Sequence, residues 1–403
     1  MKFGGTSVAD LDRIAAAAER VRQEAAAGHA VAVVVSAMAG ETNRLVGLVE
    51  KCSSLYDTRE YDTVTAAGEQ VTAGLMALAL QRMGVDARSW LGWQIPFLTD
   101  GVHGKARIRD IDTRLLARNF DEGRVAVVAG FQGLSPQNRI TTLGRGGSDT
   151  SAVALAAALG AARCDIYTDV NGVYTTDPRI VPQARKIDRI SHEEMLEMAS
   201  LGAKVLHTRS VGLAMNHGVR LRVLSSFTTD PGTLVVGEDE ILEEKIVTGI
   251  AYSADEAKIT LVGIPDCPGV AARIFGPLAA VAVNVDMIVQ SASPDGQFVS
   301  MTFTTPRADS ALAMKTLEDN RESINYDKLL LDNKVAKVSV IGAGMRSHPG
   351  VAETMFATLA EKGINIQGIA TSEIKISTLI AAEYAELAVR SLHDAYGLET
   401  AAA

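Results

Sequence analysis

Two continuous apolar runs constrain the fold of this chain more than any other feature. Residues Ala30–Ser36 and Val125–Ala129 consist almost entirely of alanine and valine. A strand that is apolar on both faces is typical of the interior of a parallel sheet with helices on both sides. Helical patterns separate these runs from each other and from two further predicted strands, Cys164–Asp169 and Val219–Leu224. The sequence therefore predicts an α/β domain with a mainly parallel open sheet sandwiched by helices.

Small or polar residues stand at the carboxyl ends of three predicted strands. They are Ser36, Gly130 and Asp169. In open parallel sheets ligands bind outside this end of the strands, where loops and helix N-termini converge. We therefore expect the chemistry of the domain along that edge of the sheet.

Composition narrows the kind of protein. The chain has 403 residues, too many for one ordinary domain, and its formal net charge of −9 argues against nucleic acid or an anionic membrane as partner. No apolar run approaches the roughly 18 residues of a membrane helix, and the start of the chain has no signal-peptide pattern. The three cysteines are far apart, which argues against a disulfide framework and a structural zinc site. We expect a cytoplasmic protein of two or three domains.

Two glycine-rich loops predict anion sites. Lys2–Ser7 and Gly144–Thr150 each combine glycines, a cation and hydroxyl groups, and each leads into a helical pattern. Glycines let backbone N–H groups approach an anion closely, and the helix N-terminus that follows adds partial positive charge. In Lys2–Ser7 the lysine precedes the glycines, so this loop is not the common phosphate loop. Two such loops suggest two anionic groups held close together, such as a nucleotide phosphate and a carboxylate.

Other side chains suggest further ligand contacts. Arg145 could clamp a carboxylate with two hydrogen bonds, and Asp149 could face an ammonium group or a metal. The turn-rich segment Thr168–Arg179 offers hydroxyls, carboxylates, an aromatic ring and an arginine, as a nucleotide site needs. On local sequence alone, Glu69 is expected to be an exposed carboxylate near a helix start. The seven histidines show neither metal-ligand spacing nor a catalytic pairing.

The last part of the chain contains an internal repeat. Ile259–Ala271 resembles Val338–Ala352, and from Gly269 and Gly350 onward the register holds without gaps at an offset of 81 residues. Each copy is predicted to form a strand, a Pro-Gly turn, a helix and a second strand, followed by more strand and helix signals. Two copies are too few for a solenoid. We expect two small α+β modules packed on each other, separated from the first domain by a turn cluster at Thr228–Gly232.

Several segments, in order along nearly the whole chain, carry a resemblance to a known family. They are Lys2–Val8, Val35–Met38 with Thr42 and Asn43, Gly68–Glu69, Thr141–Asp149, Tyr167–Arg179 and Gly202–His207. Together they resemble the motifs of the aspartate kinases within the amino-acid kinase family. The repeat looks like a pair of ACT modules, small regulatory units that bind amino acids, and Ser372–Ser377 resembles a segment of the second one.

The resemblance implies a domain plan and an activity. The plan is an amino-acid kinase domain over residues 1–240, followed by ferredoxin-like ACT modules over residues 247–327 and 328–403. The activity is transfer of the γ-phosphoryl group of ATP, with Mg²⁺ as MgATP, to the β-carboxylate of L-aspartate. The product is 4-phospho-L-aspartate, the first step toward lysine, threonine, methionine and isoleucine. A carboxylate is already ionised at neutral pH, so no general base is needed.

The resemblance also assigns site residues by matched position. The catalytic residues would be Lys2, Arg145, Asp149 and Lys204. The nucleotide would contact Lys2, Phe3, Gly4, Gly5, Thr168, Asp169, Tyr174, Thr175, Thr176, Asp177, Pro178, Arg179, Lys204 and Val205. Aspartate would contact Ser36, Thr42, Glu69, Arg145, Gly146, Gly147, Ser148 and Asp149. Arg145 would hold a carboxylate of the substrate, and Glu69 and Asp149 would lie near its ammonium group.

Similar enzymes are inhibited by lysine, threonine or both, at sites where two ACT modules meet. The residues that match this region are Asp266, Asn284, Asp286 and Gln290 in the first module, and Asn365, Ile366, Thr371, Ser372 and Glu373 in the second. Acidic side chains among them would suit a lysine ammonium. Pairing of ACT modules across chains implies a homo-oligomer, which an ACT-only subunit could also join.

Two alternative functions stay open. The first is another amino-acid kinase that acts on glutamate, acetylglutamate or a nucleotide. The combination of Glu69, Arg145 and Asp149 with paired modules favours aspartate over these substrates. The second alternative is a catalytically silent amino-acid sensor in which the ACT pair does the work, and the intact glycine loops argue against it.

The chain departs from the family pattern at three positions. Only Met1 precedes Lys2, where relatives usually carry several apolar residues, so we expect the numbering to begin inside the true chain. Cys267 stands before a Pro-Gly pair in place of a residue that is usually basic, which could change effector preference. Thr208 replaces a usual proline, with little expected effect.

Overall fold

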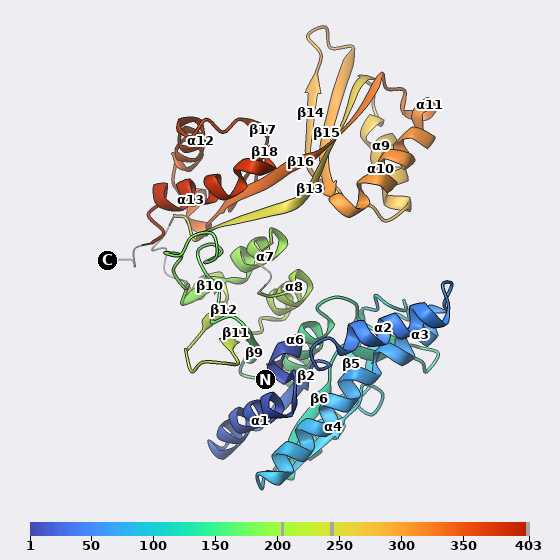
Figure 1. The fold of residues 1–403 in the computed structure, drawn as a ribbon, viewed down its shortest axis with the longest axis vertical. Coiled ribbons are helices and arrows are strands. Elements are labelled where there is room, and N and C mark those ends of the chain that lie inside the picture. The colour runs from blue at the N-terminus through green and yellow to red at the C-terminus, as the bar shows by residue number, and fades with distance from the viewer. Residues whose placement is uncertain (203–204, 242–245, 400–403) are drawn as a thin grey trace. The chain divides into compact units, whose positions relative to one another are not determined.

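The computed structural model describes residues 1–202, 205–241 and 246–399 (Figure 1). These residues form two compact units. Unit 1 contains residues 1–173, 186–200 and 205–241, and unit 2 contains residues 174–185, 201–202 and 246–399. The chain therefore passes from unit 1 into unit 2 and back twice before the predicted modules begin.

Unit 1 is built on an eight-stranded sheet. Its strand order is β10-β12-β11-β9-β1-β2-β6-β3, and all neighbours are parallel except β11 and β12. The bounds are β1 Lys2–Phe3, β2 Ala32–Val35, β3 Ala87–Trp90, β6 Val125–Ala129, β9 Cys164–Thr168, β10 Arg189–Ser191, β11 Leu221–Ser225 and β12 Thr233–Val236. The predicted mainly parallel sheet is confirmed.

Helices cover both faces of this sheet. Their bounds are α1 Leu11–Ala26, α2 Glu41–Cys52, α3 Thr58–Thr65, α4 Ala67–Arg82, α5 Arg114–Asp121, α6 Gly147–Leu159, α7 His192–Ser200 and α8 Thr208–His217. Buried side chains of α1 and α4 share one core with Val33, Val127 and Tyr167. The alternate strand residues Val34 and Val128 are equally buried, because successive side chains of a strand point to opposite faces. This double burial explains why the strands are apolar throughout.

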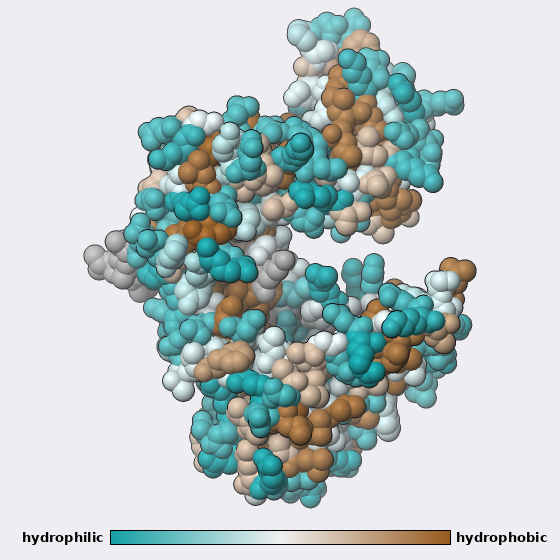
Figure 2. Space-filling view, viewed as in Figure 1, coloured by the Kyte–Doolittle hydropathy of each residue, from teal (hydrophilic) through white to brown (hydrophobic). Residues whose placement is uncertain are grey.

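Helix α4 is apolar on more than the face that packs on the sheet. Figure 2 shows apolar side chains gathered over this helix on the visible face of unit 1. Val71 and Leu78 of α4 are 56% and 62% exposed. Helix α4 therefore carries apolar side chains on its outer face as well as on the face that packs in the core.

The two-residue strand β1 lies at the centre of the sheet. Lys2 is in register with Val34 of β2 and Ile166 of β9. A short 3₁₀ helix, Gly5–Val8, follows directly. Unit 1 also contains a four-stranded sheet in the order β5-β4-β7-β8, with bounds β4 Phe97–Thr99, β5 Ile108–Ile111, β7 Gln132–Leu134 and β8 Ile140–Thr142. The position of β1 places the first glycine loop at the carboxyl edge of the large sheet.

Unit 2 contains one six-stranded antiparallel sheet in the order β14-β15-β13-β16-β18-β17. The strands are β13 Gly249–Pro265, β14 Asp286–Ala292, β15 Phe298–Pro306, β16 Lys328–Ile341, β17 Ile366–Thr371 and β18 Lys375–Ala381. The helices are α9 Val270–Ala280, α10 Ser310–Asp319, α11 Arg321–Ile324, α12 Val351–Glu361 and α13 Ala385–Ala395. The order β13-α9-β14 repeats as β16-α12-β17, so the predicted internal repeat is confirmed.

Two separate apolar cores lie on this sheet, and β13 contributes to both. Its later part, with Ile259 and Leu261, packs in the core that also contains α9 and α10. Its earlier part, with Ile250, packs with Val338 of β16 and with Leu392 of α13. The expected first module, residues 247–327, thus begins with a strand segment that belongs to the core of the second. The module limits at 240, 247 and 327 stay predictions.

A buried lysine joins strands of the two repeats. The Lys337 side chain of β16 is 6% exposed, and its Nζ lies 3.0 Å from Glu256 Oε1 and 2.6 Å from Asp286 Oδ2. Burial lowers the pKa of Lys337, but the charges of Glu256 and Asp286 outweigh burial and raise it overall. Asp286, assigned above to an effector site, is therefore already paired with a lysine of its own chain.

We predict that Lys337→Met destabilises unit 2 by about 3 kcal/mol, because it leaves the buried carboxylate of Glu256 without its cation. Hydrogen–deuterium exchange of peptides from β13 and β16, in the full chain, measures the loss. Lys334→Met, at an exposed position of the same strand, is the matched control. Equal protection of β13 in the two variants would show that the buried pair contributes little.

Candidate functional site

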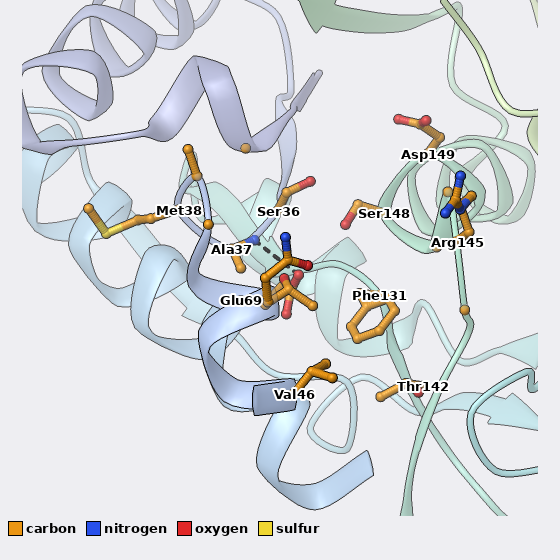
Figure 3. A pocket seen from close by; sticks show the side chains of 18 of the residues that line it. Ser36, Ala37, Met38, Val46, Glu69, Phe131, Thr142, Arg145, Ser148 and Asp149 are labelled. Carbon is orange, nitrogen blue, oxygen red and sulfur yellow. Dashed lines mark hydrogen bonds between the residues drawn. The ribbon is translucent and has the colours of Figure 1, made fainter. Parts of the chain in front are cut away.

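A cavity of about 520 Å³ lies at the carboxyl edge of the large sheet in unit 1 (Figure 3). Loops after β1, β2, β6 and β8 and the start of α4 form its walls. The residues that line it are Lys2, Gly5, Ser36, Ala37, Met38, Ala39, Gly40, Thr42, Asn43, Val46, Tyr61, Glu69, Gly104, Phe131, Thr142, Gly144, Arg145, Gly146, Gly147, Ser148 and Asp149. The two glycine loops predicted to bind anions therefore face one cavity.

An ion pair connects these two loops. Lys2 Nζ lies 2.5 Å from Asp149 Oδ1, and their side chains are 10% and 15% exposed. Asp149 stands in the first turn of α6, a favourable position for a carboxylate because of the helix dipole. Gly146, just before α6, has φ of +69°, and a Cβ there would lie 2.4 Å from the His207 side chain. The second loop therefore needs glycine at this position.

Glu69 is the buried carboxylate of the cavity. It is 3% exposed, so the expectation of an exposed helix-cap carboxylate is wrong. The fold buries it because α4 begins beside the end of β2, where Ala37 N–H donates to Glu69 Oε1 at 3.0 Å. Its other oxygen, Oε2, is buried and has no hydrogen-bond partner among the described residues. Burial raises the pKa of Glu69 to about 7, which favours an incoming cation beside it.

The remaining residues assigned to the amino acid lie around the same cavity. Ser36 and Thr42 come from the β2–α2 side, and Ser148 lies across from Ser36 beside Arg145 and Asp149 (Figure 3). Arg145 is exposed and forms no ion pair within the described parts of the chain. Its guanidinium group is therefore available to an anion that enters the cavity.

Sequence reasoning missed several lining residues. Asn43 belonged to a quoted motif but received no role, and Tyr61, Phe131 and Thr142 received none either. Phe131, two residues after the end of β6, has φ of +67°, and its N–H donates to Ser151 Oγ at 3.1 Å. The rule that ligands gather at strand ends could have found Phe131, because it follows Gly130 at the end of a predicted strand. Tyr61 carried no comparable signal.

The residues assigned to the nucleotide are divided between the two units. Lys2, Phe3, Gly4, Gly5, Thr168, Asp169 and Val205 belong to unit 1, and Tyr174, Thr175, Thr176, Asp177, Pro178 and Arg179 belong to unit 2. Gly4 N–H donates to the carbonyl of Tyr167 at 3.2 Å, which places the first loop beside the end of β9. Lys204 lies outside the described residues.

Three of these assignments concern packed side chains, Phe3, Thr175 and Thr176. Phe3 is fully buried and stacks on the Tyr167 ring at 4.7 Å between centroids, so its backbone alone remains for a ligand. Thr175 is also fully buried, and Thr176 is 4% exposed. Asp177 forms an ion pair with Arg179 at 2.7 Å, so these two side chains order the turn that they share.

Within unit 2, the segment at residues 174–185 is part of the second module's core. Ile180 and Val181 pack with Ile250 and other core residues of that module. The Ile250 N–H donates to the carbonyl of Thr175 at 2.7 Å. Thr175 Oγ1 and His393 Nε2 of α13 are joined by a hydrogen bond of 2.9 Å. Half of the predicted nucleotide loop is therefore held by unit 2.

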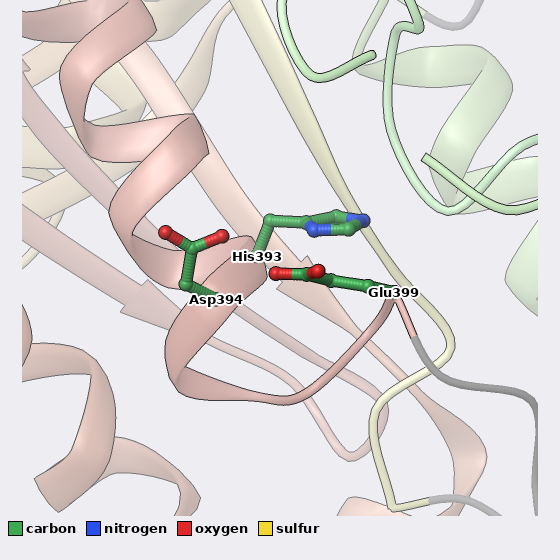
Figure 4. Close-up of side chains that lie close together, drawn as sticks. All are labelled: His393, Asp394 and Glu399. Carbon is green, nitrogen blue, oxygen red and sulfur yellow. The ribbon is translucent and has the colours of Figure 1, made fainter. Parts of the chain in front are cut away.

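One group of side chains in unit 2 has metal-ligand chemistry. The ligand atoms of His393, Asp394 and Glu399 lie within 4.8 Å of one another, and no other such group of three occurs in the described residues (Figure 4). Asp394 and Glu399 are exposed, whereas His393 is fully buried. Among the described residues that line the cavity of unit 1, the carboxylates are Glu69 and Asp149.

The residues assigned to an effector lie mostly on the surface of unit 2. Exposed members are Asp266, Asn284, Asp286, Gln290, Asn365, Thr371, Ser372 and Glu373, and Ile366 is half-buried. The carbonyl of Asn284 accepts a hydrogen bond from Thr305 Oγ1 at 2.9 Å. Glu373 forms an ion pair with Arg346 at 3.2 Å. Two of the acidic side chains expected to face an effector are thus already paired.

Comparison with known proteins identifies the class. The sequence profile of the amino acid kinase family matches residues 1–225, and that of the ACT domain matches residues 259–320 and 338–396. The aspartokinase of Pseudomonas aeruginosa is 53% identical over 403 residues, which cover 100% of this chain and 98% of the relative.

Solved structures agree with this class. Escherichia coli aspartokinase III in complex with aspartate and ADP is similar, with a TM-score of 0.84, 29% identity and 98% of each chain covered. The same enzyme in complex with lysine and aspartate has a TM-score of 0.77 and 30% identity, again over 98% of each chain. The chain thus belongs to the amino acid kinase family, as an aspartate kinase with ACT regulatory domains. The resemblance and the fold class inferred from sequence are confirmed.

Within residues 1–202, 205–241 and 246–399, no helix combines the length and the apolar character that crossing a membrane requires.

We predict a specific pH dependence from Glu69. Its folded-state pKa of about 7 exceeds the ordinary value of 4.5, so the stabilisation by its bound proton is full below pH 4.5 and is lost as the pH rises through 7. Relative to Glu69→Gln, the free energy of unfolding of the unmodified protein should fall by about 3 kcal/mol across this window. Urea unfolding followed by the fluorescence of Trp90 and Trp93, both in unit 1, measures it.

Glu50→Gln, at an exposed position of α2, is the matched control and should follow the unmodified protein at every pH. Parallel stability curves for the unmodified protein and Glu69→Gln would contradict the assigned burial effect.

Proposed function

We propose that the protein transfers the γ-phosphoryl group of ATP to the β-carboxylate of L-aspartate and forms 4-phospho-L-aspartate. This reaction would be the first step toward lysine, threonine, methionine and isoleucine. The observation that carries the proposal is the cavity itself. It combines Arg145, which forms no ion pair with any described residue, with Glu69, a buried carboxylate whose Oε2 has no hydrogen-bond partner among those residues. It is supported by the similar E. coli enzyme, whose structure contains aspartate and ADP.

The cavity offers a partner for each charge of aspartate. Arg145 would hold a carboxylate with two parallel hydrogen bonds. Glu69 Oε2 would accept a hydrogen bond from the substrate ammonium, whose charge would return Glu69 to its ionised form. Ser36, Thr42 and Ser148 would supply hydroxyl groups to the remaining oxygens.

Lys2 would stabilise charge on the transferring phosphoryl group. Its ion pair with Asp149 holds the ammonium at the edge of the amino-acid cavity, next to the N-terminus of α6. Phosphoryl transfer requires little covalent chemistry from a protein, so positioning and charge neutralisation dominate its catalysis. The aspartate carboxylate needs no base, because it is ionised at neutral pH.

Mg²⁺ would enter with the nucleotide as MgATP. It prefers phosphate and carboxylate oxygens and usually keeps several waters. Asp149, whose Oδ1 lies 2.5 Å from Lys2 Nζ, is the side chain that we would expect to contact the ion. Lys204 and the segment at residues 174–179 complete the proposed nucleotide contacts.

The direct test is formation of an acyl phosphate, trapped with hydroxylamine, from MgATP and aspartate. Parallel reactions with glutamate and acetylglutamate separate aspartate from other acceptors of this family. Turnover with aspartate alone is the expected result. Turnover with another acceptor but not with aspartate would favour the wider family, and no turnover with any acceptor, from a folded and full-length chain, would favour an amino-acid sensor.

We further propose feedback inhibition by lysine, threonine or both at the ACT modules, in a homo-oligomer. Lysine occurs with aspartate in one structure of the similar E. coli enzyme. The physical link within this chain is the segment at residues 174–185, which packs in the core of the second module. An effector that shifts this module would move Thr175 and its neighbours directly.

We predict that His393→Gln raises the KM for MgATP several-fold and weakens inhibition by lysine and threonine. The substitution removes the imidazole Nε2 that forms a hydrogen bond with Thr175 Oγ1. The KM for aspartate should stay within about twofold. Steady-state kinetics with and without the two amino acids measure both effects. Asp394→Asn, the exposed neighbour on α13, is the control and should behave as the unmodified enzyme.

A further inference from the structure

A fully buried carboxylate lies behind the wall of the catalytic cavity. Asp62 of α3 is 0% exposed. Its Oδ1 accepts a hydrogen bond from Thr142 Oγ1 at 2.5 Å, and the Gly104 N–H donates to both of its oxygens, each 3.1 Å from the nitrogen. His103 Nδ1 donates to Asp62 Oδ2 at 2.7 Å. Thr142 and Gly104 line the cavity, and Asp62 does not.

A cation acts on the same two segments from a different helix. Arg209 of α8 donates from Nη1 to the carbonyl of Leu143 and from Nη2 to the carbonyl of Ala106, both at 2.7 Å. A backbone hydrogen bond of 3.0 Å from Ala106 N–H to the Thr142 carbonyl joins the segments to each other. Residues 104–106 and 142–143 are therefore fixed by a carboxylate at one end and a guanidinium at the other.

The fixed segments lead directly into the loop that carries Arg145. Gly144 has φ of +75°, and a Cβ at this position would lie 3.1 Å from the Gly104 carbonyl oxygen. The chain thus turns sharply against residue 104 immediately before Arg145. A displacement of residues 104–106 would shift the point from which the Arg145 side chain starts.

We propose that Asp62 and Arg209 are positioning residues that set the geometry of the Arg145 loop for the amino-acid substrate. Neither side chain is among the residues that line the cavity, so both act through the backbone between them. Removing an acceptor from a buried network costs more than the net value of one hydrogen bond, because the donors left behind stay buried. A bidentate clamp on carboxylate depends on angles, so a small shift of the loop weakens aspartate binding more than nucleotide binding.

This proposal rests on the proposed kinase function, and the test separates the two. Acyl-phosphate formation is measured for the unmodified enzyme, Asp62→Asn, Arg209→Lys and the double variant, with aspartate and MgATP varied separately. Asp62→Asn and Arg209→Lys should each raise the KM for aspartate about tenfold, with the KM for MgATP changed less than about twofold. The double variant should fall short of the product of the two single effects, because both act on the same segments.

Two further variants test whether the effect is specific to the buried network and whether it depends on correct folding. Glu60→Gln removes an exposed carboxylate two residues away on α3, whose partner is Arg139, and should leave both KM values unchanged. His103→Gln removes one partner of Asp62 at a less buried position and should raise the KM for aspartate by a smaller factor, so the proposal stays testable if Asp62→Asn does not fold. Urea unfolding confirms which variants are folded.

Two results would overturn the proposal while leaving the kinase function intact. One is an active unmodified enzyme whose folded variants retain its KM for aspartate. The other is an equal rise of the KM for aspartate and for MgATP, which indicates general loosening of unit 1. If the unmodified enzyme uses another acceptor, the proposed substrate is wrong, and the same variants then test the positioning role with that acceptor.

Discussion

The ion pair between Lys2 and Asp149 is the contact on which the candidate site depends. Lys2 belongs to the two-residue strand at the centre of the sheet, and Asp149 to the first turn of α6. Both side chains are largely withdrawn from water, and two charges in such surroundings are stable only when they stay together. The pair therefore locks the start of α6 to the sheet edge. Arg145 and Ser148 take their places from that start, so one contact sets the phosphate side and the amino-acid side relative to each other.

The sequence predicted the sheet well because strands that are buried on both faces are apolar at every position. Val125–Ala129 could hardly lie anywhere other than between two layers of helices. Arg145 and Asp149 were likewise recognisable, because a glycine loop with charges has few structural uses. Glu69 was misjudged from its local context because its burial comes from the end of β2, far away in the sequence. No local pattern reports a contact of that kind.

Long-range contacts also explain the other residues that sequence reasoning missed. Asp62 stands in a polar helix beside ordinary surface residues, and only the return of the chain at Thr142 makes it a buried acceptor. The burial of Phe3 also depends on a distant partner, because its ring packs against Tyr167, and its predicted nucleotide contact stays a prediction for its backbone. The division of the nucleotide loop after Val173 was equally hidden, because Ile180 and Val181 look like ordinary apolar residues of a loop until their core partners are known.

The double membership of β13 has a consequence for how the chain acquires its structure. The start of this strand packs with β16 and α13, yet the whole first repeat is synthesised between them. The first repeat has its own core and can close as soon as it leaves the ribosome. The second repeat can complete its core only after α13 has been synthesised, although the start of β13, one of its inner strands, is made much earlier. Folding of the second repeat therefore has to close a long loop of chain. Because the first repeat lies within this loop and folds first, the effective length of the loop is reduced to the distance between the two ends of the first repeat.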